Sequence, residues 1–481
     1  MTTNSGYVLT VAGGLLRVAA SQSASSASNT IRGDFAMTSG TILIENDTGT
    51  QRDRRLSFNA NVNITGGVVA SLYNGASGQI FLNGTNNVFN PTSFYSGSST
   101  TYCGIGIVMS AGSQQLSTNQ TLAGGLVLRG GGSPTTDYVK TIANTGSGII
   151  NQIQFIDERN NSGGVVLQLG SNLSLATSAV MPSVANYSNQ VDGSGGLQVG
   201  IDANGYTLNL TPGANYGVWT VAKSTQGGVT TTTWQLSNSG AAGTGVIAAN
   251  GFIMSSSGVV TNIGEGLVLE ARGGNGTLND LGGSGSIAAT SVFRYAGTAT
   301  SANTAAKLIS NRTIGGLEVK SGYLNVQGIS TSGGVNINGG TMLINDDPSN
   351  PHVGTLNVGA GQAFIMSSGG IFFTMEDNIT FDQIVGSAGS VFSISGGTIT
   401  LDLQDIQNFD YSSSYALFSG FDSGLVSGLN IIGYDTSSYF AKLGTDGMLT
   451  FEAIPEPGTV ALLACGGLIL LLSYCRNRKL A

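Results

Sequence analysis

Residues 333–344 read GGVNINGGTMLI, two glycine pairs that are each followed by a short run of branched or apolar side chains. After the first pair, Val335 and Ile337 alternate with Asn336 and Asn338. This period of two is typical of a half-buried β-strand. Glycine adopts the positive φ angles of a tight corner without strain. The stretch therefore predicts short strands joined at glycine corners.

The same phrase recurs along the chain and sets the expected architecture. It is found as GGLVLR (124–129), GGVVLQL (163–169), GGLQV (195–199), GGLEVK (315–320) and GGTITL (396–401). No stretch of this body keeps a 3.6-residue apolar period for three helical turns. The pattern predicts an all-β fold with an elongated parallel β-helix or solenoid over residues 1–375, in which each rung buries its face on the next.

A β-sandwich array remains the competing architecture. It needs hairpin turns in place of single corners, and Asn204-Gly205, between residues 199–201 and 206–210, is the candidate hairpin turn.

The composition of the sequence changes towards the C-terminus, where aromatic residues become more frequent. Residues 415–421 (YALFSGF) and 448–451 (MLTF) belong to a series of aromatic-rich segments. The end of a solenoid needs a cover, because an exposed rung is a strand edge that invites aggregation. We therefore expect a β-rich capping region over residues 376–452.

Composition narrows the possible partners. Charged residues make up 9% of the chain against about 25% in ordinary domains, and hydrophobic residues make up 40%. The chain can thus build a core, while its polar surface comes mostly from uncharged side chains. The net charge of −8 disfavours nucleic acid, which is bound through a basic stripe.

The last residues form a tail of three unlike parts. Residues 454–458 read IPEPG, the run from 459 to 475 has no charged residue, and Arg476, Arg478 and Lys479 follow. The uncharged run predicts one transmembrane helix over about residues 459–475. By the positive-inside rule, the basic end stays in the cytoplasm and the body lies outside. Pro455 and Pro457 keep the preceding stretch extended, a shape that a processing enzyme can grip.

The order of these parts resembles the PEP-CTERM sorting signal. The resemblance implies recognition of residues 454–481 by an exosortase, a membrane transpeptidase that would cut near Pro455, Glu456 and Pro457. These three residues would be substrate residues, and the lipid bilayer would hold the helix until release to the cell surface or extracellular matrix. The glycine-pair units resemble the autotransporter-associated β-strand repeat, which implies a β-helical passenger with an adhesive or matrix role. Extracellular polysaccharide is the further partner that this role suggests.

Enzymatic chemistry has few candidate residues. His352 is the sole histidine, which excludes an HExxH zinc site, and no Gly-x-Ser-x-Gly elbow accompanies it. We expect no metal, cofactor or catalytic residue. The alternative is a β-helical polysaccharide lyase or glycosidase, which would use a pair of carboxylates. The candidate pairs are Asp157-Glu158, Asp192 with Asp202, Asp346-Asp347 and Glu376-Asp377.

An N-terminal export signal is not evident in the given sequence. Residues 1–6 have no basic segment, and Arg17 interrupts the short apolar run around it. We expect the printed start to lie inside a longer gene product. The sequence as a whole predicts an exported, non-catalytic structural or adhesive protein of the bacterial surface or matrix.

Overall fold

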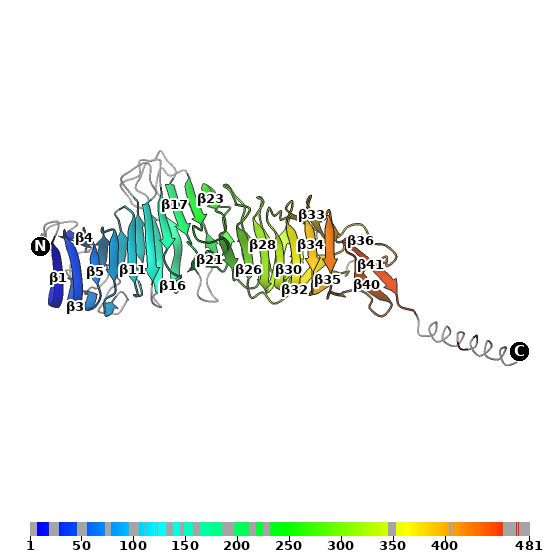
Figure 1. Cartoon of the computed structure of the whole chain (residues 1–481), viewed down its shortest axis with the longest axis horizontal. Coiled ribbons are helices and arrows are strands. Elements are labelled where there is room, and N and C mark those ends of the chain that lie inside the picture. The colour runs from blue at the N-terminus through cyan, green and yellow to red at the C-terminus, as the bar shows by residue number, and fades with distance from the viewer. Residues whose placement is uncertain are drawn as a thin grey trace, which may run out of the picture.

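The computed structural model describes most of the body and little of the tail. The described residues are 7–18, 28–45, 55–72, 78–95, 105–130 without 111 and 123, 138–144, 149–156, 164–184, 197–210, 218–224, 231–344 and 353–455 without 404, 405 and 407, together with Leu468 and Leu470. They form a long rod of β-strands that lie across its axis, with the chain advancing from one end to the other (Figure 1).

Two long sheets run along this rod, and nearly all of their strand pairs are parallel. The first sheet consists of β1 (Val8–Val18), β3 (Asp34–Glu45), β5 (Val62–Ile64), β6 (Val68–Leu72), β8 (Asn86–Phe89), β9 (Ser93–Tyr95), β11 (Gln114–Thr118), β13 (Tyr138–Asn144), β15 (Val165–Leu169), β17 (Leu197–Asp202), β20 (Thr232–Ser237) and β23 (Val259–Ile263).

The second sheet covers almost the whole described length. Its strands are β2 (Ser28–Ile31), β4 (Arg55–Phe58), β7 (Gly78–Leu82), β10 (Ile105–Met109), β12 (Leu126–Arg129), β14 (Ile149–Ile156), β16 (Leu173–Val184), β18 (Thr207–Asn209), β19 (Trp219–Thr220), β21 (Val246–Ala249), β22 (Phe252–Ile253), β24 (Val268–Ala271), β25 (Leu278–Asp280), β26 (Val292–Ala296), β27 (Ala306–Ile309), β28 (Gly316–Ser321), β29 (Tyr323–Gln327), β30 (Val335–Ile344), β32 (Ala363–Thr374), β34 (Val391–Ile394), β35 (Thr398–Asp402), β38 (Ser423–Val426) and β39 (Asn430–Ile432).

Two small sheets complete the described structure. One is parallel and consists of β31 (Thr355–Val358), β33 (Gln383–Gly386) and β37 (Phe418–Ser419). The other is antiparallel and consists of β36 (Tyr415–Ala416), β40 (Tyr439–Leu443) and β41 (Met448–Ala453). The short 3₁₀ helix η1 (Ala302–Thr304) lies before β27.

The core is a set of columns that run along the rod. In one column Phe293 pairs with Leu317, Leu317 with Val335, Val335 with Phe364, and Phe364 with Phe392. Each of these side chains is buried. The alternation seen in the sequence thus sends one set of side chains inward and the other outward, and each winding covers the apolar face of its neighbour. The predicted all-β fold with parallel strands is confirmed.

Glycine pairs mark the places where a strand passes from one face of the rod to the next. In β30, residues 335–337 pair with β28, whereas residues 341–344 pair with β29. The change of partner falls at Gly339-Gly340, where Gly339 has φ +155°. A Cβ on Gly339 would lie 2.4 Å from the carbonyl oxygen of Lys320, so this corner has room only for glycine.

The candidate hairpin of the competing β-sandwich, at Asn204-Gly205, is not formed. Both residues have positive φ (46° and 80°), as the turn chemistry predicts. The flanking strands belong to different sheets, however: β17 pairs in parallel with β15 and β20, while β18 pairs in parallel with β16 and β21. The turn is a corner of the winding, and the pairing that a β-sandwich needs is not formed there.

Uncharged polar side chains link successive windings on the outside of the rod. Asn83 Nδ2 donates to Asn59 Oδ1 over 3.0 Å, and Asn262 Oδ1 accepts from Ser286 N over 2.9 Å. Asn238 acts in the same way on the Gly205 amide, at 2.8 Å. These amides satisfy backbone and side-chain groups at the corners, where the sheet ladders end.

Among the named strands of the described rod, antiparallel pairing occurs at its C-terminal end. The parallel pairing continues as far as β38 and β39, and the antiparallel sheet of β36, β41 and β40 follows. Phe451 of β41 lies among Phe409, Tyr411 and Tyr434, with ring centroids 5.1–5.4 Å from its own. The placement of a domain boundary near residue 375 stays a prediction.

Beyond Pro455, only Leu468 and Leu470 of the tail are described, both in helical conformation and both exposed. Among the described residues, no helix has the length and apolar character needed to cross a membrane. The expected helix over residues 459–475 lies almost wholly outside them.

Candidate functional site

The first candidate site is the point where the chain leaves the folded body. β41 is hydrogen-bonded on both sides, to β40 and β36. Directly after β41, Ile454 N donates to Ser438 O over 2.8 Å. Pro455, the next residue, is exposed. The ordered sheet thus ends immediately before the proline motif, so Pro455 is accessible from the surroundings.

The other residues of the predicted sorting signal cannot be placed beside Pro455. Glu456, Pro457, Arg476, Arg478 and Lys479 lie outside the described residues. Their roles stay predictions from the sequence.

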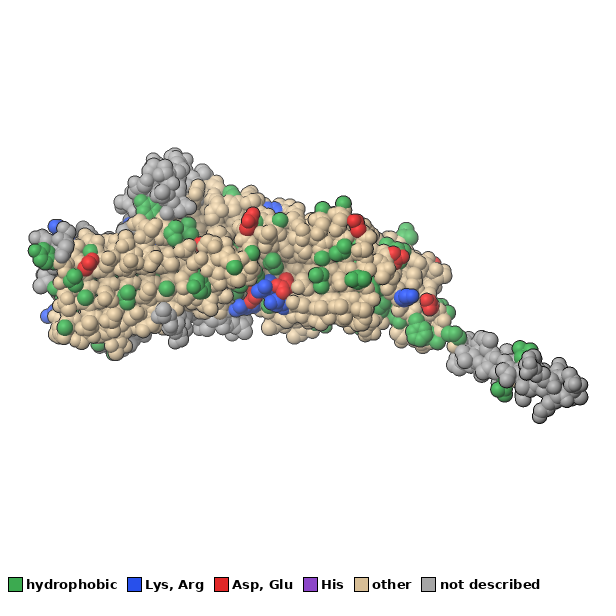
Figure 2. Space-filling view, viewed as in Figure 1, with side chains coloured by type: hydrophobic (Ala, Val, Ile, Leu, Met, Phe, Trp, Pro, Cys, Tyr) green, Lys and Arg blue, Asp and Glu red, His purple; other side chains and the backbone are tan. Residues whose placement is uncertain are grey.

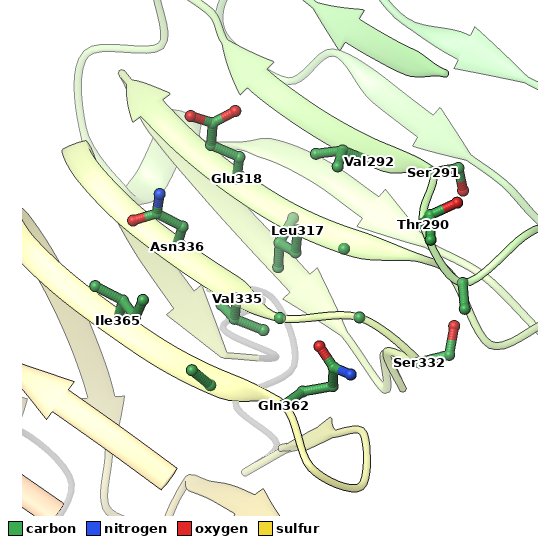
Figure 3. A pocket seen from close by; sticks show the side chains of 15 residues that line it. Thr290, Ser291, Val292, Leu317, Glu318, Ser332, Val335, Asn336, Gln362 and Ile365 are labelled. Carbon is green, nitrogen blue, oxygen red and sulfur yellow. The ribbon is translucent and has the colours of Figure 1, made fainter. Parts of the chain in front are cut away.

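A second candidate site, which the sequence analysis missed, is a groove on the outer face of the rod. It has a volume of about 510 Å³ and crosses β26, β28, β30 and β32 (Figure 3). Its floor follows from strand register. Val292 pairs with Gly316, and Leu317 N donates to Gly334 O over 2.9 Å, which places the two glycines side by side.

The groove on the outer face of the rod forms where small residues occupy matching positions of neighbouring windings. Gly334 lies against Ala363, whose carbonyl oxygen would be 3.0 Å from an added Cβ. Gly316 and Gly334 are the second members of two of the glycine pairs that recur in the sequence. The signal for the groove was therefore present in the sequence, but finding it needs the register that brings these glycines together.

Polar side chains line both ends of the groove. Glu318 and Asn336 lie farther along their strands, while Ser332 and Gln362 lie near the starts of β30 and β32 (Figure 3). Ser332 Oγ donates to Ile314 O over 3.1 Å. Val292 is half-buried, and Ile365 is 40% exposed, so the groove also presents apolar surface.

One end of the groove continues into a ladder of alternating charges. Glu270, Arg294 and Glu318 occupy matching positions on β24, β26 and β28. Arg294 Nε lies 2.5 Å from Glu318 Oε2, and its Nη1 lies 3.2 Å from Glu270 Oε2. Arg272 and Lys320 add a further cation to each glutamate. Figure 2 shows a mixed cluster of acidic and basic side chains near the middle of a rod with few other charges on this face.

This ladder favours the ionised form of Glu270. Burial opposes ionisation of Glu270, but the hydrogen bonds and charges of Arg272 and Arg294 outweigh it and lower the pKa of this carboxyl. Burial likewise opposes the charge of Arg294, while Glu318 and Glu270 raise its pKa. Glu318 is the one ionisable residue that lines the groove, and it forms ion pairs with Arg294 and Lys320.

Two described carboxylates of the predicted catalytic pairs, those of Asp202 and Asp377, accept hydrogen bonds at turns. Asp202 accepts hydrogen bonds from Gln168, Asn204 and Ser239. Burial would raise its pKa, but these bonds lower it overall. Asp377 accepts from the amides of Ile379 and Thr380 over 2.7 and 2.6 Å.

The structure does not bring the predicted acidic pairs together in a described cleft. Asp192, the expected partner of Asp202, lies outside the described residues, as do Asp157, Glu158, Asp346, Asp347 and His352. Glu376 is described, and its amide donates to Thr380 O over 2.9 Å.

The chain was compared with known proteins in two ways. No protein-family model matches it, and a search of curated proteins gave no match.

Proposed function

We propose that this chain is an exported, non-catalytic protein of the bacterial surface or extracellular matrix, with a parallel β-helical body and a C-terminal sorting tail. The single observation that supports it most is that strand pairing ends with β41 and that Pro455, the first residue of the proline motif, is exposed just beyond it. A membrane protease that grips an extended backbone needs such an accessible segment next to its folded cargo.

In this proposal each part of the chain has a physical task. The stacked windings form the exported body, the antiparallel β36–β41–β40 sheet caps its C-terminal end, and residues 459–475 hold it in the bilayer until cleavage. An exosortase-type transpeptidase would cut near Pro455, Glu456 and Pro457, while Arg476, Arg478 and Lys479 keep the short end in the cytoplasm.

Mass spectrometry of the mature protein's C-terminus, isolated from its native host, tests this proposal. We expect the mature chain to end near Glu456 and Pro457→Ala to retain the basic end. Thr450→Ala, which lies in β41 upstream of the motif, is the matched control and should be processed like the wild type. A wild-type mature chain that still contains Arg478 would overturn processing and leave a permanent membrane anchor.

The non-catalytic part of the proposal is supported by the occupation of Asp202, Asp377 and Glu318 in turns and ion pairs. A β-helical lyase or glycosidase is the alternative. Incubation of the protein with polysaccharides, followed by measurement of new reducing ends or unsaturated sugars, separates the two. Turnover that disappears when one acidic pair is replaced by alanine would establish the enzyme.

A further inference from the structure

We propose that the groove over β26, β28, β30 and β32 binds a neutral polysaccharide chain; the inference names a partner for the proposed surface protein and in that sense rests on the proposed function. Nothing in the sequence alone assigned a binding site to this face. The argument uses the groove's shape, its unused polar groups and its charge.

The shape favours an extended ligand. Four neighbouring strands contribute to the groove, and strand spacing is about 4.8 Å, so the groove runs for roughly 14 Å along the rod. Its floor is backbone at Gly316 and Gly334, with Ala363 beside them. A ligand can therefore approach the sheet closely while it extends from one winding to the next.

The polar groups favour a ligand that both donates and accepts hydrogen bonds. Elsewhere on the rod, the side-chain amides of Asn59, Asn238 and Asn262 are occupied by contacts between windings. For Asn336 and Gln362, the structure gives no side-chain hydrogen bond within its described residues. Each carboxamide offers a carbonyl acceptor and two N–H donors. Sugar hydroxyls, which also donate and accept, complement both amides.

The apolar groups fit the same ligand. The exposed side chain of Ile365 lies beside Asn336 on the neighbouring strand, and Val292 lines the groove on the far strand, β26. A pyranose ring presents C–H groups on its faces and hydroxyls at its rim. It can cover this apolar surface while its rim reaches Asn336 and Gln362.

The charge distribution selects a neutral chain over an acidic or basic one. Glu318 is the groove's ionisable residue, and Arg294 and Lys320 already balance its charge. A uronate in the groove would meet Glu318, whereas a cationic ligand would compete with Arg294, which is 2.5 Å from Glu318. An uncharged polysaccharide is neither repelled by Glu318 nor in competition with Arg294.

Calorimetry with the full-length protein tests the inference, in a detergent whose head group contains no sugar. The probes are dextran and a soluble β-glucan as neutral polysaccharides and polygalacturonate as an acidic one. We expect at least one neutral probe to bind with an affinity that hardly changes with salt, because no charge pairs form. The double variant Asn336→Ala/Gln362→Ala should bind it about tenfold more weakly, since two neutral hydrogen bonds are lost.

Gln235→Ala is the matched control, because Gln235 is an exposed outward amide on β20, away from the groove. It should bind like the wild type. An unchanged denaturation midpoint in the double variant shows that weaker binding does not arise from misfolding. If the midpoint falls, Ile365→Ser provides the second groove variant and should also weaken binding.

Failure of both neutral probes, equal binding by the groove variants and the wild type, or tighter salt-dependent binding of polygalacturonate would each overturn the inference. C-terminal processing is measured separately, so the sorting proposal can succeed or fail independently of this result.

Discussion

Arg312 reaches back across the rod to Thr261, whose carbonyl oxygen accepts a hydrogen bond from Arg312 Nη1 over 2.9 Å. The same guanidinium donates to the carbonyls of Leu281 and Ser284. It satisfies backbone acceptors near β23, the last strand of the first sheet. A single side chain thus forms hydrogen bonds with several windings at the place where the first sheet ends.

Replacing Arg312 should loosen this junction. Arg312→Ala removes the Arg312 donors from the partly buried carbonyls of Leu281 and Thr261, whereas Ser284 O keeps its bond from Thr261 N. We expect a loss of about 2–4 kcal/mol of stability. Arg312→Lys should recover only part of it, because an ammonium lacks the planar fork. The denaturant midpoint measures the effect. Arg272→Ala, which removes a more exposed arginine, should change the midpoint far less; equal losses would contradict the special role of Arg312.

Lys140 should make stability depend on pH. Its side chain is fully buried, with Nζ 2.6 Å from Gly112 O and 3.2 Å from Gln114 Oε1. Burial lowers the pKa of this amine from 10.5 to about 7. Between these values the unfolded chain binds more protons than the folded chain, so the stabilising contribution is complete above pH 10.5 and is lost as the pH falls to about 7.

Lys140→Met should flatten this dependence, which we expect to amount to up to about 5 kcal/mol across the window. Denaturant midpoints measured from pH 6 to pH 11 check it. Lys442→Met, at an exposed position on β40, is the control and should keep the wild-type slope. A wild-type protein without a slope in this range would show that Lys140 stays charged when folded.

Removal of Arg294 should destabilise the charge ladder most strongly at pH values where Glu270 is ionised. Arg294→Met leaves Glu270 and Glu318 without the cation between them, at a cost of about 1–3 kcal/mol for these partly buried carboxylates. Because the folded-state pKa of Glu270 is lowered, its contribution is present above about pH 4.5 and is lost on acidification. The stability difference between the wild type and the variant should therefore shrink as the pH falls below 4.5, as thermal unfolding at several pH values can show.

Phe451 should hold the final sheet to the rod. Phe451→Ala removes a ring packed against Phe409, Tyr411 and Tyr434, for which a cost of about 3 kcal/mol is typical. We expect faster hydrogen exchange in β40 and β41 with little change in β3 to β20. Uniformly faster exchange along the whole rod would indicate that its two ends unfold together. Phe440→Ala, at an exposed position on β40, is the control.

The sequence predicted the positions of the strands better than it predicted which strands pair with one another. Alternation after glycine pairs identified segments such as β28 and β35, because a period of two is local information. It could not show that Gly339-Gly340 lies within one strand that changes partners, or that Asn204-Gly205 is a corner between sheets. Both depend on register with windings far away in the sequence.

The candidate sites differ in the same way. The proline motif is contiguous, so its residues can be named from the sequence alone. The groove joins Val292, Gly316, Asn336 and Gln362 from four windings, and only the unequal lengths of the connecting loops decide which residues become neighbours. No local pattern contains that information.

The uncharged links between windings also determine how the rod responds to its surroundings. Asn59, Asn238 and Asn262 connect neighbouring windings by amide hydrogen bonds, which dissolved ions do not screen as they screen exposed ion pairs. A change from fresh water to brine would therefore leave these hydrogen bonds between windings largely intact. We expect the stability of the rod to change little with salt concentration wherever uncharged side chains join its windings.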